Sequence, residues 1–247
     1  MPVDYLASLA APQRSTRTNL HLGAGLAFVA GALNAGGFLA VGQYTSHMTG
    51  MVSTAADNFA LGQWVVAIGA LLAFAAFLAG AMCTALLVNY SRRRQPRWAY
   101  LPTLSLEALL LLGFGVIGSQ LLPHQIERVS LTALLLCFTM GLQNALVTKI
   151  SNAEIRTTHL TGLVTDFGIE LGRLIYWNRG HGRPGEIKVR ANRRRLRIHA
   201  TMIAAFFGGG VSGALAFKYL GFISTVPLAL GLVAIAVASL FRMKQAD

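Results

Sequence analysis

The sequence predicts an all-α fold: a polytopic membrane protein whose six transmembrane helices form two inverted three-helix repeats, each with a short Thr-Gly helix. Composition is the first reason, because 54% of the 247 residues are hydrophobic and 12% are charged, whereas soluble domains have about 25% charged residues. The charges also cluster and leave long uncharged stretches, such as 18–56 and 58–91. A bilayer span needs about 20 predominantly apolar residues. A polar motif that occurs twice is the third reason.

Six stretches satisfy the length requirement for a membrane-spanning helix. They are Leu20–Val41, Trp64–Val88, Tyr100–Leu121, Ser130–Ile150, His199–Lys218 and Phe222–Phe241. The uncharged run after Asp57 is longer than one untilted helix needs, so we expect its first part to lie outside the span. The chain then divides into a cytoplasmic N-terminal segment (1–19), membrane repeat 1 (20–121), an outer loop (122–129), membrane repeat 2 (130–241) with a basic cytoplasmic loop (173–197), and a cytoplasmic C-terminus (242–247).

The positions of lysine and arginine predict the orientation, because cytoplasmic loops of membrane proteins carry an excess of both. If both termini are cytoplasmic, 19 of the 21 basic residues lie inside, and only Arg128 and Lys218 lie outside. A topology with five or seven spans would place a basic cluster outside. The charges therefore support six spans.

The net charge of +12 is mainly a consequence of this topology. Residues 179–197 hold eight basic residues and one acid, Glu186, and we expect this loop to lie near anionic lipid headgroups. No aromatic interleaving or recognition motif accompanies the charge, so no nucleic-acid partner is expected. The expected partners are the lipid bilayer and an unknown small solute, and a homo-oligomer is left open.

A six-residue motif occurs in both halves of the chain. The segment His47-Met48-Thr49-Gly50-Met51-Val52 matches His159-Leu160-Thr161-Gly162-Leu163-Val164 except at the Met/Leu positions, and Gly31–Ala35 matches Gly141–Ala145 upstream. Each repeat has three spans, and an odd number of spans reverses the chain direction, so the second repeat should be inverted. Transporters are often built from such repeats, which meet at one site.

The motifs supply the candidate substrate-binding residues, which are Asn34, His47, Thr49, Gly50, Asn144, His159, Thr161, Gly162 and Asp166. A threonine at a helix start can cap the helix by accepting a backbone N–H. If each motif dips into the membrane as a short helix, its N-terminus favours an anion or electron-rich group. The alternative is a Thr-Gly turn at the membrane surface. The two asparagines have two interpretations, as substrate contacts or as interhelical hydrogen-bonding groups.

Ionisable residues follow the second motif. Asp166 and Glu170 are one helical turn apart, whereas the first repeat has Thr54 and Asn58 at the aligned positions. Any acid–base function is therefore asymmetric. The spacing of histidines and carboxylates matches no strong metal motif, so no metal or cofactor is expected, and Asp166, Glu170 and Arg173 should pair locally.

Three features lie inside the predicted spans. Glu107 lies in the third span, where a carboxyl group is costly, and should face protein or a cavity. The segment Gly208–Gly213 has the small-x-x-x-small spacing of close helix packing, with a hinge as the alternative. The pair Gly36-Gly37 can interrupt the first helix.

With these residues in view, the chain resembles the YoaK family of bacterial six-helix membrane proteins of unknown function. The matching stretches are Gly31–Gly37, Thr45–Gly50, Met140–Ala145 and Arg156–Gly162 with Thr165-Asp166. The resemblance implies a bacterial inner-membrane protein and supplies no substrate. This chain departs from the family pattern at Asn34, where the family often has an acid, and at Met51, where it often has asparagine. The missing acid places proton coupling through position 34 in doubt.

The sequence thus favours a small-solute secondary transporter with a site between inverted repeats, in which Asp166 and His159 are candidates for proton handling. A passive aquaporin-like or formate-channel-like channel is the alternative. An intramembrane enzyme ranks third, because the two motifs should approach from opposite membrane faces and no nucleophile–base pair is evident. We therefore expect the chain not to be an enzyme.

Overall fold

The computed structural model describes residues 16–95, 99–119, 126–150, 160–176 and 189–244. These residues are mainly helical, and none of them forms a strand, which confirms the all-α class for this part of the chain. The elements are α2 (Thr16–Val41), α3 (Met48–Ala60), α4 (Trp64–Arg94), α5 (Leu101–Ser119), α6 (Ile126–Ile150), α7 (Leu160–Ile175), α8 (Arg193–Leu220), the 3-10 helix η2 (Gly221–Ser224) and α9 (Thr225–Lys244).

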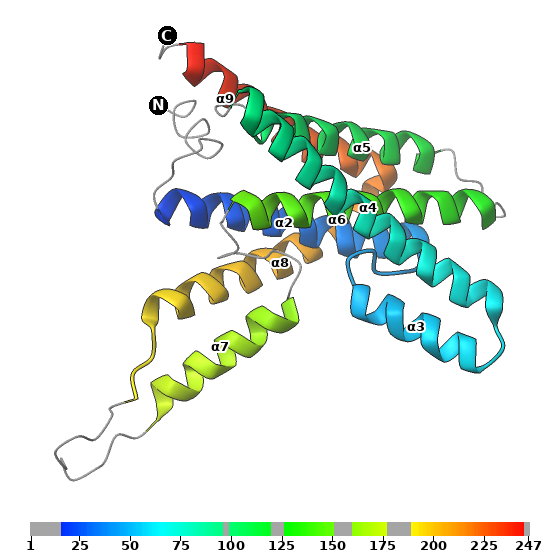
Figure 1. Cartoon of the computed structure of the whole chain (residues 1–247), viewed down its shortest axis with the longest axis horizontal. Coiled ribbons are helices and arrows are strands. Elements are labelled where there is room, and N and C mark those ends of the chain that lie inside the picture. The colour runs from blue at the N-terminus through cyan, green and yellow to red at the C-terminus, as the bar shows by residue number, and fades with distance from the viewer. Residues whose placement is uncertain (1–15, 96–98, 120–125, 151–159, 177–188, 245–247) are drawn as a thin grey trace.

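Within the described residues, five segments are long and apolar enough to cross a membrane. They are Gly23–Val41, Trp64–Arg94, Leu101–Ser119, Leu131–Lys149 and Arg193–Ala234. The last segment contains both α8 and the first half of α9. Gly221 ends α8 with a φ of +62°, and Figure 1 shows the chain reversing its direction there. These apolar helices agree with a multi-pass membrane protein.

Several helices extend beyond the predicted spans, and α4 and α8 do so by six residues each. Helix α4 continues past Val88 to Arg94, and α8 begins six residues before His199. The start of α8 is stabilised by Asn192, whose side chain accepts hydrogen bonds from the backbone N–H groups of Arg194 and Arg195. A capped helix can continue into the polar region because its terminal N–H groups are satisfied.

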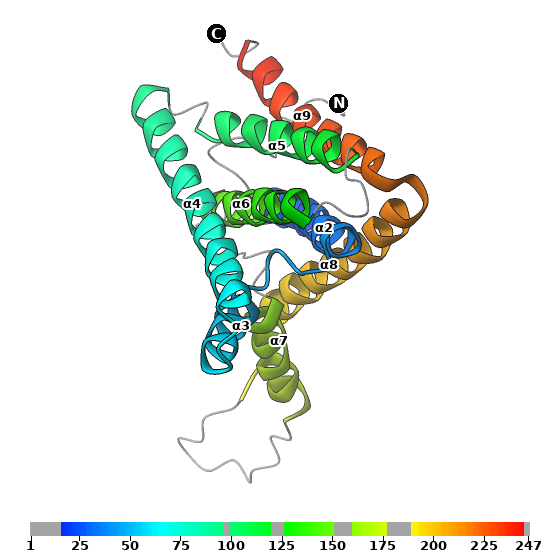
Figure 2. The same cartoon turned by 90° about the vertical axis from the view of Figure 1, so that its right-hand side faces the viewer.

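The helices surround a central pair, α2 and α6. In cross-section, α4 lies on one side of this pair and α8 on the other, and α5 with α9 covers the pair from one direction (Figure 2). The short helices α3 and α7 both project at the opposite corner in this view (Figure 2). Along the long axis they occupy different halves, and their N-terminal ends point toward the middle of the molecule (Figure 1).

Close backbone contacts at four Phe-x-x-Gly motifs join the long helices in two pairs. Helix α2 packs mainly against α8, and α4 packs mainly against α6. In both pairs the glycine of each helix lies against the carbonyl oxygen of the other helix's phenylalanine, so that an added Cβ would overlap that oxygen. These contacts are Gly31 with Phe206, Gly209 with Phe28, Gly80 with Phe138, and Gly141 with Phe77.

The two helix pairs are related by constant shifts in sequence. Phe28 and Gly31 of α2 correspond to Phe138 and Gly141 of α6, 110 residues later, and Phe77 and Gly80 of α4 correspond to Phe206 and Gly209 of α8, 129 residues later. A third contact follows the same shifts. The hydroxyl of Thr84 donates to the carbonyl of Leu142 over 2.8 Å, and the equivalent Gly213 lies against the carbonyl of Ala32.

The other glycine predictions have mixed outcomes. Close packing is confirmed for Gly209 and Gly213, whereas an added Cβ at Gly208 would meet nothing within 4 Å. The prediction that Gly36-Gly37 can interrupt the first helix is wrong, because α2 is continuous to Val41. Both glycines lie against side chains of neighbouring helices, the ring of Phe217 for Gly36 and Leu136 for Gly37.

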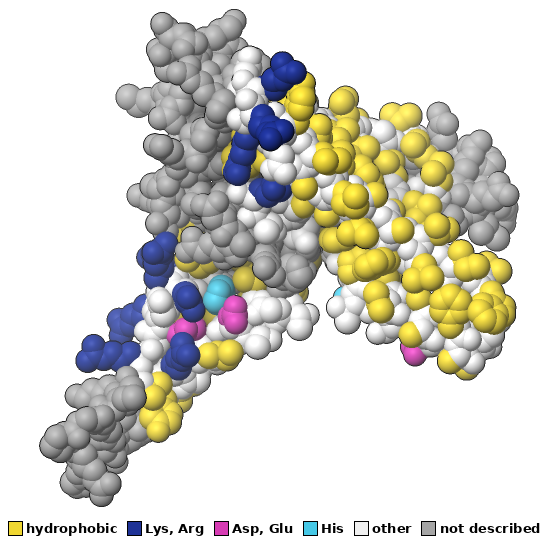
Figure 3. Space-filling model, viewed as in Figure 1, with side chains coloured by type: hydrophobic (Ala, Val, Ile, Leu, Met, Phe, Trp, Pro, Cys, Tyr) yellow, Lys and Arg dark blue, Asp and Glu magenta, His cyan; other side chains and the backbone are white. Residues whose placement is uncertain are grey.

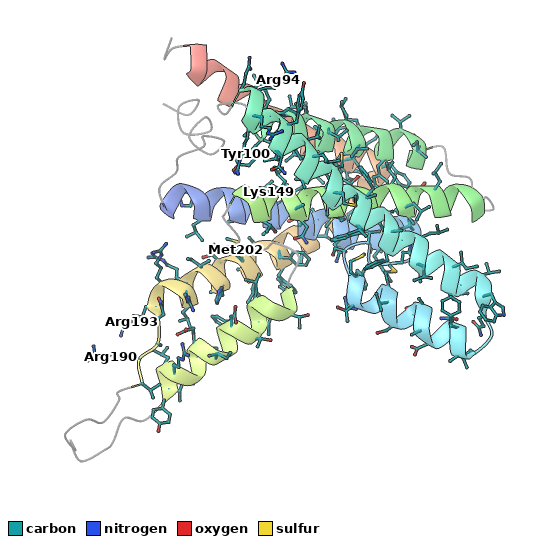
Figure 4. The ribbon with its side chains drawn as sticks, in the orientation of Figure 1. Arg94, Tyr100, Lys149, Arg190, Arg193 and Met202 are labelled. Carbon is teal, nitrogen blue, oxygen red and sulfur yellow. The ribbon has the colours of Figure 1, made fainter. Side chains whose placement is uncertain are left out.

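Basic residues gather at one end of the molecule. Figure 3 shows lysine and arginine side chains over the end of α4 and the start of α8, whereas the part formed by α3 and the start of α4 is mainly hydrophobic. Arg94, Arg190 and Arg193 lie toward the end that also carries the start of α2 and the end of α9 (Figures 1 and 4). This distribution is the one that the positive-inside rule predicts for one membrane face.

The glycine contacts predict a paired effect on stability. Replacing Gly31 or Gly141 by alanine should lower the free energy of unfolding by about 1–3 kcal/mol, because the new methyl group overlaps a backbone carbonyl that cannot rotate away. Gly25, on the same helix as Gly31, has open space around it, so Gly25→Ala should be neutral or stabilising. Denaturant unfolding of the purified variants in one detergent measures all three. Equal stability of Gly31→Ala and Gly25→Ala would contradict the packing.

Candidate functional site

The first motif is anchored to α2 by Asn34. Gly42 has a φ of +74° and turns the chain back after α2. The side-chain oxygen of Asn34 then accepts hydrogen bonds from the hydroxyl of Ser46 (2.8 Å) and from its backbone N–H (3.3 Å). Asn34 therefore fixes the segment that precedes α3, within its own half of the chain.

His47 is the residue at which α3 begins. It is the N-cap, with φ −90° and ψ 70°, and its side chain makes no capping hydrogen bond. The prediction that Thr49 caps the helix is therefore wrong, because Thr49 already lies in the first turn and is exposed. The imidazole of His47 lies over Gly50, and a Cβ at position 50 would overlap the ring. Glycine at this position therefore makes room for His47.

His47 and Gly50 line an open pocket of about 850 Å³. Its walls come from α3, from the first turns of α4, from the segment after α2 and from the start of α6. Most of the lining is apolar, and the polar groups include Thr54, Gln43 and Tyr44. Tyr44 is held in place by stacking on Phe38, with ring centroids 4.5 Å apart.

The second motif begins α7, which packs against α8. Thr161, Gly162 and Asp166 are exposed on this helix, and His159 lies outside the described residues. Leu160 is the first residue of α7, so Thr161 also lies inside its helix rather than before it. The two Thr-Gly segments are therefore both first turns of short helices, as the sequence predicts.

Glu170 connects α7 to the start of α8. Its carboxylate accepts a hydrogen bond from the backbone N–H of Asn192 (2.6 Å) and pairs with Arg173 (2.9 Å). The Asn192 N–H, together with Arg173, holds the pKa of Glu170 below its ordinary value. The predicted local pairing is confirmed for Glu170 and Arg173, and Asp166 is not part of this pair.

Asp166 instead lines a second cavity of about 250 Å³ between α7 and α8, together with Arg195, Ile198 and His199. His199 is 9% exposed, and its Nδ1 has no hydrogen-bond partner. Figure 3 shows acidic, basic and histidine side chains close together on this part of the molecule. A buried imidazole nitrogen normally has a partner, so the cavity offers an unused hydrogen-bonding position beside a carboxylate and a guanidinium group.

The two cavities occupy equivalent positions in the two halves. Asp166 aligns with Thr54, and the 129-residue shift relates Arg195, Ile198 and His199 to Val66, Gly69 and Ala70. All four of these counterparts line the larger pocket. Equivalent positions are therefore uncharged in the first cavity and carry an acid, a base and an imidazole in the second.

Neither of the two cavities described above contains all the described site residues. Asn34 adjoins the first motif through Ser46, and His47 and Gly50 share the larger pocket. Asp166 lies in the smaller cavity. Asn144 is half-buried on α6, and its side-chain oxygen has no partner. Among the described residues, no group of three or more histidine, cysteine, aspartate or glutamate side chains is placed to hold a metal ion.

Arg195 and His199 are candidate residues that the duplicated motif does not predict. Arg195 lies in the basic segment, and His199 lies at the predicted start of a span. The Phe-x-x-Gly motif shared by α4 and α8 is the sequence feature that could have identified Arg195 and His199. It gives the 129-residue alignment that relates them to residues lining the larger pocket.

The Glu170 contacts predict a pH-dependent contribution to stability. Because the folded-state pKa is lowered, the contribution is complete above the unfolded value of 4.5 and is lost as the pH falls through the folded-state pKa. Glu170→Gln should therefore lower the unfolding temperature at neutral pH, and its difference from the wild type should shrink below about pH 4.5. The exposed Asp57→Asn is the control. A difference that is constant with pH would contradict the ionised pairing.

Comparison with known proteins identifies the family of the chain. No curated protein and no solved structure matches it. A family model described as "Protein of unknown function (DUF1275)" matches residues 22–238, which include all the helices described above except the ends of α2 and α9. The resemblance to an uncharacterised family of membrane proteins agrees with this match. The chain belongs to the DUF1275 family.

Proposed function

We propose that this protein is a small-solute secondary transporter of a bacterial inner membrane, built from two inverted repeats with one cavity in each. One observation carries the proposal. The sequence shift that relates the glycine contacts of α4 and α8 also relates the residues of these two helices that line the two cavities. Repeats of this kind, with a substrate path at their interface, are a recurring transporter architecture.

The inversion follows from counting spans. Helices α8 and α9 count as two spans because the chain reverses at Gly221. Repeat 1 then contributes α2, α4 and α5, and repeat 2 contributes α6, α8 and α9. Three spans in each repeat give opposite orientations. The start of α2 and the end of α9 then lie on the basic side, which is the cytoplasmic side by the positive-inside rule.

The short helices α3 and α7 supply the middle of the path. Their N-terminal ends point toward the middle of the molecule from opposite halves (Figure 1). The N-terminus of a helix presents unpaired N–H groups and the positive end of the dipole. Thr49 with Gly50 and Thr161 with Gly162 are the first-turn residues there, and Asn34, Asn144, His47 and His159 belong to the same two motifs.

The cavities supply the two ends of the path. In the proposed path the larger pocket, with His47 and Thr54, is the outer binding position. The smaller cavity, with Asp166, Arg195 and His199, is the cytoplasmic one. A solute with a hydrogen-bonding or charged group gains partners in the second cavity that the first cavity lacks. Different binding groups on the two sides give the solute different affinities for the two conformations, so that its binding shifts the balance between them.

A passive channel is the second candidate function. The observation that favours it is the end-to-end placement of two short helices whose N-termini face each other, since such dipole ends can form a selective constriction without alternating access. The two functions differ in saturation. A transporter binds its solute in each cycle and saturates, whereas flux through an open pore keeps rising with solute concentration.

Uptake by proteoliposomes tests the proposal. A panel of labelled amino acids, organic acids, sugars and nucleosides is offered with and without a pH gradient. We expect saturable uptake of at least one class, reduced about tenfold or more in Asp166→Asn, which corresponds to about 1.4 kcal/mol of lost interaction. Asp57→Asn, an exposed acid outside both cavities, should transport normally.

Two results would contradict this proposal. Uptake that never saturates would favour the channel. Uptake no faster than that of empty liposomes for every class would argue against both candidates.

A further inference from the structure

Glu107 is a buried carboxyl group that the proposed path does not use. It lies in the middle of α5, with an exposed fraction of 0%, and neither carboxyl oxygen has a hydrogen-bond partner. The prediction that Glu107 faces protein or a cavity is confirmed by this burial. An ionised carboxylate without a partner in such a place costs several kcal/mol, so its state of protonation needs an explanation.

Glu107 faces α6, as its neighbours on α5 show. Tyr100, Glu107 and Phe114 are seven residues apart, which places them on one face of the helix. The hydroxyl of Tyr100 donates to the carbonyl of Lys149 on α6, and Figure 4 shows these two residues at the same end of the molecule. Phe114 packs in one cluster with Leu136 of α6. Glu107 lies midway between these contacts.

The same contacts give the residues of α6 at the level of Glu107. Helices α5 and α6 run antiparallel, since Tyr100 adjoins Lys149 and Phe114 adjoins Leu136. The midpoint of α6 between these two partners is at Leu142 and Gln143. Gln143 is fully buried, and its amide nitrogen donates to the carbonyl of Leu26 on α2 over 3.2 Å. Its side-chain oxygen has no partner.

Buried oxygen atoms without a hydrogen-bond partner thus occur on α5 and at the same level of α6. The hydroxyl oxygen of Thr103, one turn before Glu107, is also buried without a partner. Glu107 and Gln143 together leave three oxygen atoms that can only accept unless a proton is added. A protonated carboxyl group supplies the missing O–H donor and removes the unpaired charge.

Charged groups near α5 lie at its ends. The elements packed against it are α4, α6, α9 and η2. The described titratable or charged side chains of α4 are Cys83, Tyr90, Arg92, Arg93 and Arg94, and those of α6 are Cys137 and Lys149. Neither η2 nor the part of α9 with described side chains has one. Arg92 bonds the hydroxyl of Tyr100, about 10 Å along the axis from Glu107. Cys137 packs in a separate cluster with Met51 and Ala73.

We propose that Glu107 is a proton-binding site in the interior of the helix bundle, neutral in this conformation and deprotonated in another conformation of the transport cycle. The step is a proton transfer alone: water or a path residue delivers a proton to the carboxylate, and the same O–H bond breaks on release. The role of this site in a transport cycle rests on the proposed transport function. Its location rests on the burial of Glu107 and on its position at the level of Gln143.

Dicyclohexylcarbodiimide provides a test that does not depend on solute flux, because this apolar reagent modifies protonated carboxyl groups in apolar surroundings. The wild-type protein in proteoliposomes is incubated with it between about pH 5 and pH 9, and the adduct is located by mass spectrometry. We expect labelling of Glu107 whose rate falls about tenfold or more as the pH rises. Glu107→Gln should remove this adduct, whereas Glu170→Gln should retain it, because Glu170 is ionised and paired.

The stability of Glu107→Gln provides a second readout. An amide resembles the neutral acid in shape, so the variant should unfold at the wild-type temperature or above. Absence of the adduct, or a labelling rate of Glu107 that is independent of pH, would overturn the proposal. Protection of Glu107 from labelling by sodium chloride at constant pH would also overturn it, because it would indicate that a metal cation binds instead of a proton. If Glu107 is labelled with the expected pH dependence but no solute is taken up, the proton-binding site is supported. Only the proposed transport function is then contradicted.

Discussion

The approach of helix backbones at four glycines is the constraint on which the rest of this structure depends. Within a bilayer, lipid tails are as apolar as leucine side chains, so helices associate through close packing and polar contacts rather than through hydrophobic burial. Here Gly31, Gly80, Gly141 and Gly209 each lie against a carbonyl oxygen of a neighbouring helix. A larger residue at any of them would separate the helices, and with them the short helices and cavities that they carry.

These contacts join the two halves of the chain to each other. Helix α2 packs against α8, and α6 packs against α4, so each pair contains one helix from each half. Each short helix packs against one of these long helices, α3 against α4 and α7 against α8. In the proposed transport cycle, α4 with α3 and α8 with α7 are therefore the natural moving units, and the glycine contacts, which lack interlocking side chains, are the surfaces on which they slide.

The sequence predicts the long helices and the duplicated motif well, because apolar length and repeated residues are local signals. It also indicates the burial of Glu107 and the Glu170–Arg173 pair, since both follow from helical position. It does not predict the bond from Asn34 to Ser46, which depends on how the segment after Gly42 folds back. The charged cavity is missed for a similar reason: Arg195 belongs to a region that reads as a basic loop, and only the packing of α7 on α8 brings it to Asp166.

Side-specific labelling of two equivalent cysteines measures the inverted arrangement most directly. Thr49→Cys and Thr161→Cys are introduced separately, each with the native Cys83 and Cys137 replaced by alanine, and intact cells and inside-out vesicles are treated with a membrane-impermeant thiol reagent. Both threonines are exposed at the starts of α3 and α7. The inverted repeats predict that Thr49→Cys reacts faster from the outer side and Thr161→Cys faster from the cytoplasmic side. Faster reaction of both from the same side would contradict the account.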